Sequence, residues 1–121
     1  MPAVQVLNPQ AVQDLVETFD AAIVLELIEA FLEDSLQLVH QMQQGIQNND
    51  AEVVQRAAHT LKSQSKTFGL EQLAPLCQKL ETLAAGSELP DHASDTSNEV
   101  QDAYRLAQNA LRDLRESLRA Y

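Results

Sequence analysis

The sequence predicts an all-α protein, an up-and-down antiparallel four-helix bundle with a short N-terminal cap helix. The chain has 121 residues, of which 45% are hydrophobic, enough for one domain with a real core. Leu, Ala, Gln and Glu, which are good helix formers, are abundant, and only three glycines and four prolines interrupt them. Apolar residues recur mostly every three or four positions, the spacing of one helix face. We therefore expect residues 1–121 to form a single helical domain.

The first two helices are marked by their N-terminal caps. Asn8 followed by Pro9 is typical of a cap and a first helical position, and the short helix should run to about Phe19. Asp20 can then cap a long second helix. Its apolar repeat continues until a segment of turn formers, so we expect it to end between residues 45 and 49.

The third helix has clear signals at both ends. Asp50 can cap it, and Glu52 lies in the first turn, where a negative charge is favourable. It should run to about Thr67, with Gly69 supplying a left-handed residue after its end. Very few residues separate it from the next helix, which favours an antiparallel hairpin.

The fourth helix should begin near residues 71–73 and end at about Ala85, with Gly86 as its stop. Pro75 would cost a hydrogen bond and cause a clash deep inside a helix. It is tolerated in the first turn, where the backbone N–H groups have no partner in any case. We therefore expect a late start or irregular geometry at this point.

A loop should connect the fourth and last helices. Residues 86–96, GSELPDHASDT, are rich in turn formers and have no periodicity. We expect Ser97 or Asn98 to cap the last helix, whose apolar stripe includes Tyr104 and Leu111.

Composition also excludes several classes of function. The net charge is −10, from 18 acidic and 8 basic residues, and such a surface repels nucleic acid and anionic membranes. The sequence contains no run of 18 apolar residues, so we expect no transmembrane helix. Residues 1–10 lack the basic start and apolar segment of a signal peptide. The single cysteine, Cys77, cannot form an internal disulfide. We therefore expect a cytoplasmic protein, and a lone bundle with short loops is most simply a monomer.

One histidine lies in an unusual setting on the third helix. Residues 1–55 contain no Lys or Arg, whereas Lys62 and Lys66 follow His59 closely. At about 100° per residue, Ser63 and Lys66 fall within roughly 40° of His59, and Lys62 lies at about 60°. The apolar residues of this helix fall roughly opposite, at about 160° to 220°; they are Val54, Ala57, Leu61 and Phe68.

This arrangement suits a carrier of phosphate. Two lysines next to His59 disfavour a charged imidazolium, and a neutral imidazole nitrogen is a nucleophile without the help of a base. The same lysines would stabilise an anionic phosphoryl group bound to the ring. A histidine on a solvated helix face is usually a surface residue without a special role, and that interpretation stays open on spacing alone.

A family resemblance favours the functional interpretation. Residues 57–81, AAHTLKSQSKTFGLEQLAPLCQKLE, resemble the signature of the histidine-containing phosphotransfer (HPt) domain family. That pattern is A-H-x-L-K-G-x-(S/A)-x-x-x-G, followed by a helix of the form L-x-x-L-C-x-x-L-E. The matching positions are Ala58, His59, Leu61, Lys62, Ser65, Gly69, Leu73, Leu76, Cys77, Leu80 and Glu81.

The resemblance implies a specific role. HPt domains accept a phosphoryl group from the aspartyl phosphate of a response-regulator receiver domain and pass it to another receiver. The matching acceptor is His59, through Nε2, and Lys62 matches the lysine that helps to position the phosphate. The receiver supplies Mg²⁺, so we expect the chain to bind no metal or cofactor of its own. A hybrid sensor kinase is a further candidate partner.

Ser63 and Lys66 lie on the same face of the third helix as His59. Ser63 stands where the family usually has glycine, directly beside His59 on the helix, and its hydroxyl could bond the phosphate. Lys66 adds charge to the same face at a position where the family varies. We expect receivers to dock around His59, with exposed apolar residues of the first two helices contributing.

Other functions have weaker support. No glycine-rich phosphate loop is present, so we expect neither ATP binding nor kinase activity, and the chain should not be an enzyme. Glu29, Glu33 and His40 lack the Glu-x-x-His motif of a di-iron bundle, and Cys77 lies on an inner face as a buried thiol would. The main alternative is a degenerate HPt-like bundle that docks a signalling partner without chemistry.

Overall fold

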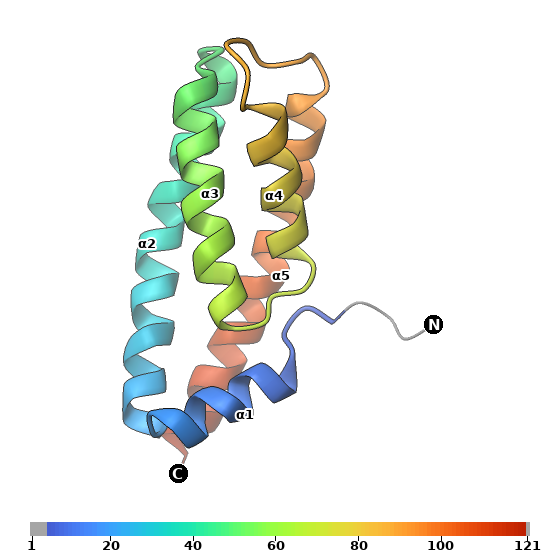
Figure 1. The fold of residues 1–121 in the computed structure, drawn as a ribbon. Coiled ribbons are helices and arrows are strands. Elements are labelled where there is room, and N and C mark those ends of the chain that lie inside the picture. Colours follow the sequence, from blue (N-terminus) through green and yellow to red (C-terminus); the bar gives the residue numbers. More distant parts are fainter. Residues whose placement is uncertain (1–4, 121) are drawn as a thin grey trace.

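The computed structural model describes residues 5–120, and this part of the chain contains five helices and no strand. Residues 1–4 and residue 121 lie outside the described range. The absence of a signal-peptide pattern in residues 1–10 therefore concerns a segment that is only partly described. Figure 1 shows four helices side by side, with the short first helix lying across one end. The predicted four-helix bundle with an N-terminal cap helix is therefore confirmed. The helices are α1 (Pro9–Thr18), α2 (Ala21–Gln47), α3 (Ala51–Thr67), α4 (Leu73–Leu83) and α5 (Ala93–Arg119).

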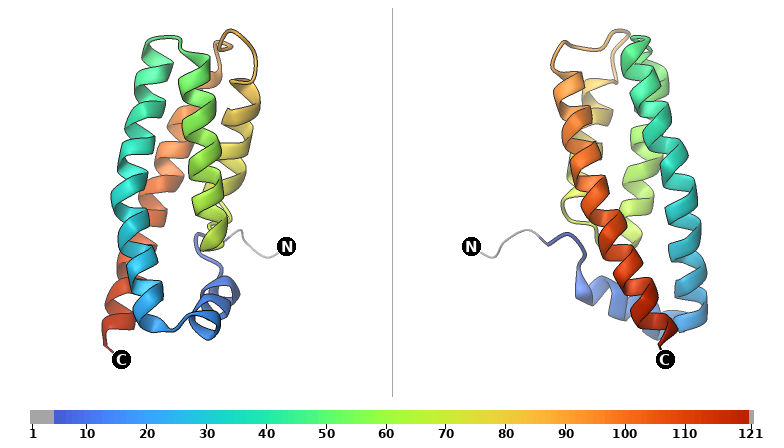
Figure 2. Two further views of the ribbon diagram at one scale, coloured as in Figure 1. Left: turned by 60° about the vertical axis from the view of Figure 1, so that its left-hand side comes forward. Right: turned by 180° about the vertical axis from the view of Figure 1, so that it is seen from behind.

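The caps predicted for α1 and α2 are present. The side chain of Asn8 accepts a hydrogen bond from the backbone N–H of Gln10 at 2.9 Å, and Pro9 is the first helical residue. The side chain of Asp20 accepts one from the N–H of Ile23 at 3.0 Å. α1 has no fully buried residue, whereas α2 contributes a continuous inner face. In both views of Figure 2, α1 lies at the end of the bundle where the C-terminus is found.

The turn between α3 and α4 orients the two helices that form the candidate site. α3 ends as predicted, with Gly69 in the left-handed region at φ 63°. The N–H of Gly69 donates to the carbonyl of Lys66 at 3.1 Å, and that of Leu70 donates to Ser65 at 3.0 Å. This pair of bonds is a Schellman motif, accompanied by burial of Leu70. The chain therefore reverses direction within a few residues, and α4 packs against α3.

α4 starts late, as Pro75 requires. The helix begins at Leu73, so Pro75 lies in its first turn. It ends at Leu83, slightly before the predicted end at Ala85.

The predicted start of the last helix is wrong. α5 begins at Ala93, within the segment expected to be a loop, and neither Ser97 nor Asn98 is its cap. Ala93, Ser97 and Val100 are all buried, as is Thr96. Their spacing of three and four turns small side chains toward the core, and this burial outweighs the turn preference of the segment. The true loop is therefore shorter than residues 86–96.

The core lies between α2, α3, α4 and α5 and is almost entirely apolar. The apolar face predicted for α3 is buried, and Phe31 of α2 packs edge-on against Phe68 with ring centroids 5.6 Å apart. Cys77 is fully buried, which confirms it as a core residue, and desolvation raises the pKa of its thiol to about 12. A single buried hydroxyl pair joins α2 to α5 among the described residues, with Ser35 Oγ 2.7 Å from the hydroxyl of Tyr104.

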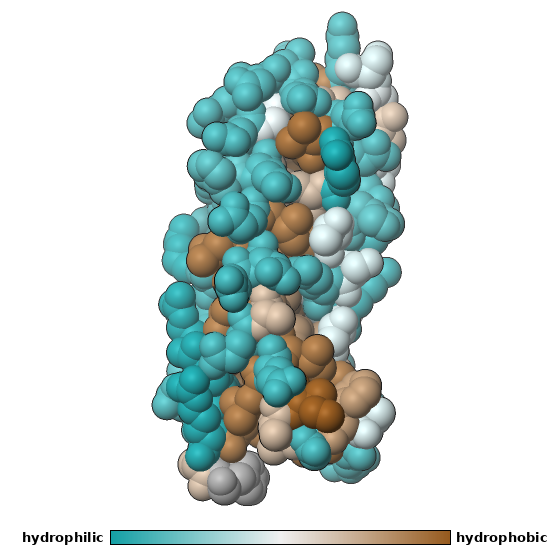
Figure 3. All heavy atoms as spheres, turned by 90° about the vertical axis from the view of Figure 1, so that its left-hand side faces the viewer, coloured by the Kyte–Doolittle hydropathy of each residue, from teal (hydrophilic) through white to brown (hydrophobic). Residues whose placement is uncertain are grey.

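No helix in residues 5–120 is long and apolar enough to cross a membrane. The outer face over α2 nevertheless carries apolar side chains among polar ones, most densely toward its lower half in Figure 3. Exposed residues of this kind in α2 and the preceding turn are Phe19, Ile23 and Leu36.

Candidate functional site

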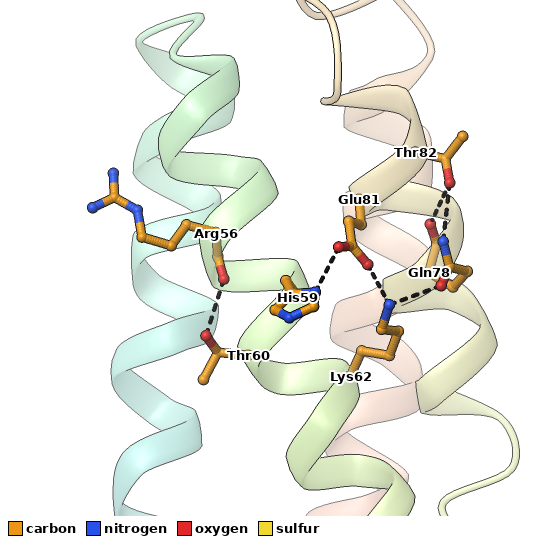
Figure 4. Close-up of polar contacts among 7 residues, drawn as sticks. All are labelled: Arg56, His59, Thr60, Lys62, Gln78, Glu81 and Thr82. Atoms are coloured by element: carbon orange, nitrogen blue, oxygen red, sulfur yellow. Dashed lines mark hydrogen bonds and ion pairs between the residues drawn. The ribbon is translucent and has the colours of Figure 1, made fainter.

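His59 lies near the middle of α3 and faces solvent. Its side chain is 61% exposed, on the face opposite the buried stripe, as the helical spacing predicted. Its Nδ1 lies 2.6 Å from Oε2 of Glu81, which α4 contributes from the neighbouring side of the hairpin. Figure 4 shows the other ring nitrogen, Nε2, turned away from α4. One nitrogen is thus held by the protein while the other remains accessible.

Glu81 joins His59 to Lys62. Its second oxygen, Oε1, accepts a hydrogen bond from Lys62 Nζ at 2.6 Å, and the same ammonium donates to Gln78 Oε1 at 2.8 Å. The side chains of Lys62 and Glu81 are only 13% and 17% exposed. Figure 4 shows the side chains of Lys62, Gln78 and Glu81 converging between α3 and α4. The result is a partly buried network with one open position, at His59.

The geometry of α4 explains why the network forms here. Leu73, Cys77 and Leu80 are buried and fix the rotation of α4 against α3. Gln78 and Glu81 are one turn apart and therefore lie on the same side of α4, at its edge with α3. Gln78 is held in place by Thr82, whose hydroxyl accepts from its Nε2 at 3.1 Å.

The network favours an ionised Glu81. The hydrogen bond from Lys62 is the main cause that lowers the pKa of Glu81 below its ordinary value of 4.5, with a smaller contribution from His59. Burial acts in the opposite direction and is outweighed. At neutral pH, Glu81 is therefore a carboxylate, which can only accept hydrogen bonds.

A carboxylate at this position selects one form of the imidazole ring. Because Glu81 cannot donate, Nδ1 of His59 must carry the proton in the bond of 2.6 Å between them. In the neutral ring this leaves the lone pair on Nε2. A groove of about 290 Å³ lies beside the ring, lined by Glu52, Gln55, Arg56, His59 and Glu81. The accessible nitrogen is therefore the nucleophilic one.

The four candidate residues named from the sequence are not equivalent. The structure brings Lys62 to His59 through Glu81, as described above. Ser63 and Lys66 are exposed on the His59 side of α3, and within residues 5–120 their side chains form no hydrogen bond or ion pair. They belong to the surface around the site, whereas Lys62 belongs to the network.

The expected electrostatic setting of His59 needs correction. Spacing along α3 predicted that two lysines lie beside the ring and disfavour its charged form. In the structure, the ammonium of Lys62 pairs with Glu81, and that carboxylate also contacts the ring. Spacing within α3 cannot reveal this carboxylate, because α4 contributes it.

Sequence reasoning did not assign Glu81 and Gln78 to the site. Glu81 was recognised only as the last residue of the family pattern. The available signal was the polar pair at positions 78 and 81 beside the apolar stripe of α4, which a predicted antiparallel hairpin would place against α3. Which residue of α3 they meet depends on the length of the turn.

The other two histidines do not form a comparable cluster within residues 5–120. His40 and His92 are exposed. Within residues 5–120, no group of three or more His, Cys, Asp or Glu residues could hold a metal ion.

The described residues form a four-helix bundle in which an exposed histidine, His59, is joined through a glutamate to a lysine, an arrangement suited to carrying a phosphoryl group. The chain belongs to the Hpt domain family, because the model of that family matches residues 26–121. It is therefore a histidine phosphotransfer protein of a phosphorelay, and members of this family carry phosphate rather than act as kinases.

A solved structure gives independent support for the fold. Histidine-containing phosphotransfer protein B from Pseudomonas aeruginosa superposes with a TM-score of 0.87 at 22% identity. The match covers 95% of this chain and 98% of that one. The comparison with curated proteins found no match.

Proposed function

We propose that this chain receives a phosphoryl group on Nε2 of His59 from the aspartyl phosphate of one receiver domain and transfers it to the aspartate of another. The observation that carries the proposal is the hydrogen bond of 2.6 Å between His59 Nδ1 and Glu81, which leaves Nε2 accessible with its lone pair. Family membership supplies the reaction class, and the geometry supports His59 as the acceptor.

In the proposed transfer, the lone pair of Nε2 attacks phosphorus as the bond from phosphorus to the aspartyl oxygen breaks. The aspartate leaves as a carboxylate, and the new bond joins phosphorus to Nε2. The ring keeps its proton on Nδ1 and gains positive charge, which the Glu81 carboxylate stabilises as a buried aspartate does for the imidazolium of a serine protease. The reverse steps deliver the group to the second receiver.

Lys62 is suited to positioning the phosphoryl group. An ammonium has three N–H donors, and Glu81 and Gln78 accept from two of them. The third can donate to a phosphoryl oxygen at Nε2. Ser63 and Lys66 are exposed beside this position and can contribute a hydroxyl donor and a further positive charge.

The receiver supplies the remaining components of the reaction. We propose that it brings the Mg²⁺ that neutralises the transferring phosphoryl group, and that this chain needs no cofactor of its own. Docking would use the face around His59 and the adjoining surface of α2 and α3. A groove of about 400 Å³ between these helices is lined by Leu38, Gln41, Val53, Arg56, Ala57 and Thr60.

Transfer from a phosphorylated receiver tests the proposal. The purified chain is mixed with a panel of phosphorylated receiver domains from the same genome in the presence of Mg²⁺, beside His59→Gln as the matched variant. We expect acid-labile, base-stable phosphate on the wild type alone. Receiver binding without any transfer would instead support the non-catalytic docking module.

A further inference from the structure

A second, smaller groove lies between α2 and α3, further toward the end of α3. It measures about 170 Å³ and is lined by Leu27, Ala30, Phe31, Asp34, Gln64, Thr67 and Phe68. Pockets for small-molecule ligands usually measure about 300–1,000 Å³, so this groove suits one side chain rather than a whole ligand.

The groove lies within the area that a docked receiver would cover. Gln64 comes five residues after His59, which is about 7.5 Å along the helix axis. A standard protein interface covers about 800 Å² on each partner, equivalent to a disc of roughly 16 Å radius. Gln64 also lies about 140° around α3 from His59, on the side that faces α2, so a receiver that covers both His59 and the α2 side of α3 extends over this groove.

Two acceptors distinguish the groove from a purely apolar depression. Asp34 is the only charged residue in its lining, and within residues 5–120 its carboxylate has no hydrogen bond or ion pair. Oε1 of Gln64 is buried without a hydrogen-bond partner in the same part of the chain. The nearby Glu29 differs, because Arg119 donates to it at 2.8 Å. The groove thus has one negative charge at its surface and one unsatisfied neutral acceptor in its wall, beside an apolar floor.

We propose that this groove takes a lysine or arginine side chain of the receiver, an inference that rests on the proposed function. The apolar stem of either side chain packs against Leu27 and Phe68, and the charged head reaches Asp34 and Gln64. An apolar occupant would cover the Asp34 carboxylate without satisfying it and would leave Gln64 Oε1 unsatisfied, which is costly for a buried polar group. The groove therefore selects receivers that carry a cation at this distance from their phosphorylated aspartate.

Charge reversal at the groove tests this inference. Asp34→Lys places a cation against the incoming cation, whereas Glu33→Lys makes the same charge change at the preceding position of α2, outside the groove lining. Both variants and the wild type are assayed for transfer from a receiver that exchanges phosphate with the wild type. Labelling of His59 by phosphoramidate, which needs no docking, serves as the control for folding and for the chemistry of the site.

We expect Asp34→Lys to raise KM for the receiver about tenfold or more, with kcat and phosphoramidate labelling unchanged. Glu33→Lys should change KM less than about threefold. A Lys→Glu or Arg→Glu substitution on the receiver face beside its phosphorylated aspartate should restore transfer to Asp34→Lys and weaken transfer to the Glu33→Lys control, which keeps Asp34.

Three results would overturn the inference. Equal effects of the two reversals would indicate general surface charge, and a lower KM for Asp34→Asn would indicate an apolar occupant. Failure of every receiver to exchange phosphate with the wild type would remove the receiver as partner, and with it the lysine or arginine proposed to occupy the groove. That last outcome is distinguishable because the wild type itself fails, whereas the first two leave wild-type transfer intact.

Discussion

Replacing Glu81 with alanine tests the network at its centre. Glu81 is the common acceptor for His59 and Lys62, with both contacts at 2.6 Å. Its removal leaves the Lys62 ammonium, which is only 13% exposed, with Gln78 as its remaining partner. It also frees Nδ1 of His59, so the ring can place its proton on either nitrogen.

The size of the effect follows from these contacts. Glu81 accepts two hydrogen bonds, and each hydrogen bond to a charged group contributes about 1.5–3 kcal/mol. The bond from Lys62 to Gln78 that remains, and partial solvation of the site, reduce the loss. We therefore expect the free energy of unfolding to fall by about 2–3 kcal/mol, well above the figure of about 0.5 kcal/mol for an exposed ion pair on one helix. Glu52→Ala is the matched control, because Glu52 forms such a pair with Arg56 at 3.7 Å.

Urea denaturation of the wild type and both variants measures this difference. The pKa of Glu81 is lowered in the folded chain, so its stabilising contribution is complete above its ordinary value of 4.5 and is lost as pH falls through the lower folded pKa. The gap between wild type and Glu81→Ala should thus narrow below pH 4.5. Phosphoramidate labelling of His59 should also slow, on the order of tenfold, once the ring is no longer held.

An effect of Glu81→Ala no larger than that of Glu52→Ala would refute this reasoning. So would a stability difference that is the same at pH 3.5 and pH 7, since the contribution comes from the charged form of Glu81.

Three further predictions concern the scaffold. Gly69→Ala should lower the free energy of unfolding by at least about 1–2 kcal/mol, because φ is 63° and a Cβ would lie 2.7 and 2.8 Å from side-chain carbons of α1 and its N-cap. Amide exchange should show α1 loosened, and unchanged exchange there would contradict this account. Cys77, with its pKa near 12, should resist a thiol reagent at pH 8 until the chain unfolds, so fast labelling of the native chain would contradict its burial. Ser35→Ala and Tyr104→Phe should be coupled by about 0.5–3 kcal/mol in a double-mutant cycle in urea, whereas additive effects would argue against their contact of 2.7 Å.

Local signals in the sequence predicted most of the fold. Asn8, Asp20 and Asp50 were recognised as caps because a side-chain acceptor before an apolar repeat satisfies the free N–H groups of a helix. Gly69 was recognised because a left-handed residue commonly ends a helix. These features depend only on neighbouring residues, so one sequence suffices to find them.

The start of α5 could not be predicted in this way. Ser97 and the residues before it favour turns locally, and only contacts with the other helices reveal that Ala93 and Thr96 are buried. Tertiary packing therefore decides this boundary against local preference.

In the candidate site, too, the residues of a single helix could be predicted, whereas the contact between two helices could not. The exposure of His59 followed from periodicity within α3, and Lys62 followed from its spacing on the same helix. Glu81 contributes from α4, and its position relative to His59 depends on the α3–α4 turn and on the rotation of α4. Pairing between helices is set by packing, which the spacing within either helix does not determine.

The most direct test of the central claim is to locate phosphorus on the chain after transfer from a receiver. Phosphorus–nitrogen and phosphorus–proton couplings in NMR spectra of the phosphorylated chain distinguish Nε2 from Nδ1 and one histidine from another. The account predicts a single phosphohistidine, at Nε2 of His59, with Nδ1 still protonated and bonded to Glu81. Phosphorus on Nδ1, or on His40 or His92, would contradict it.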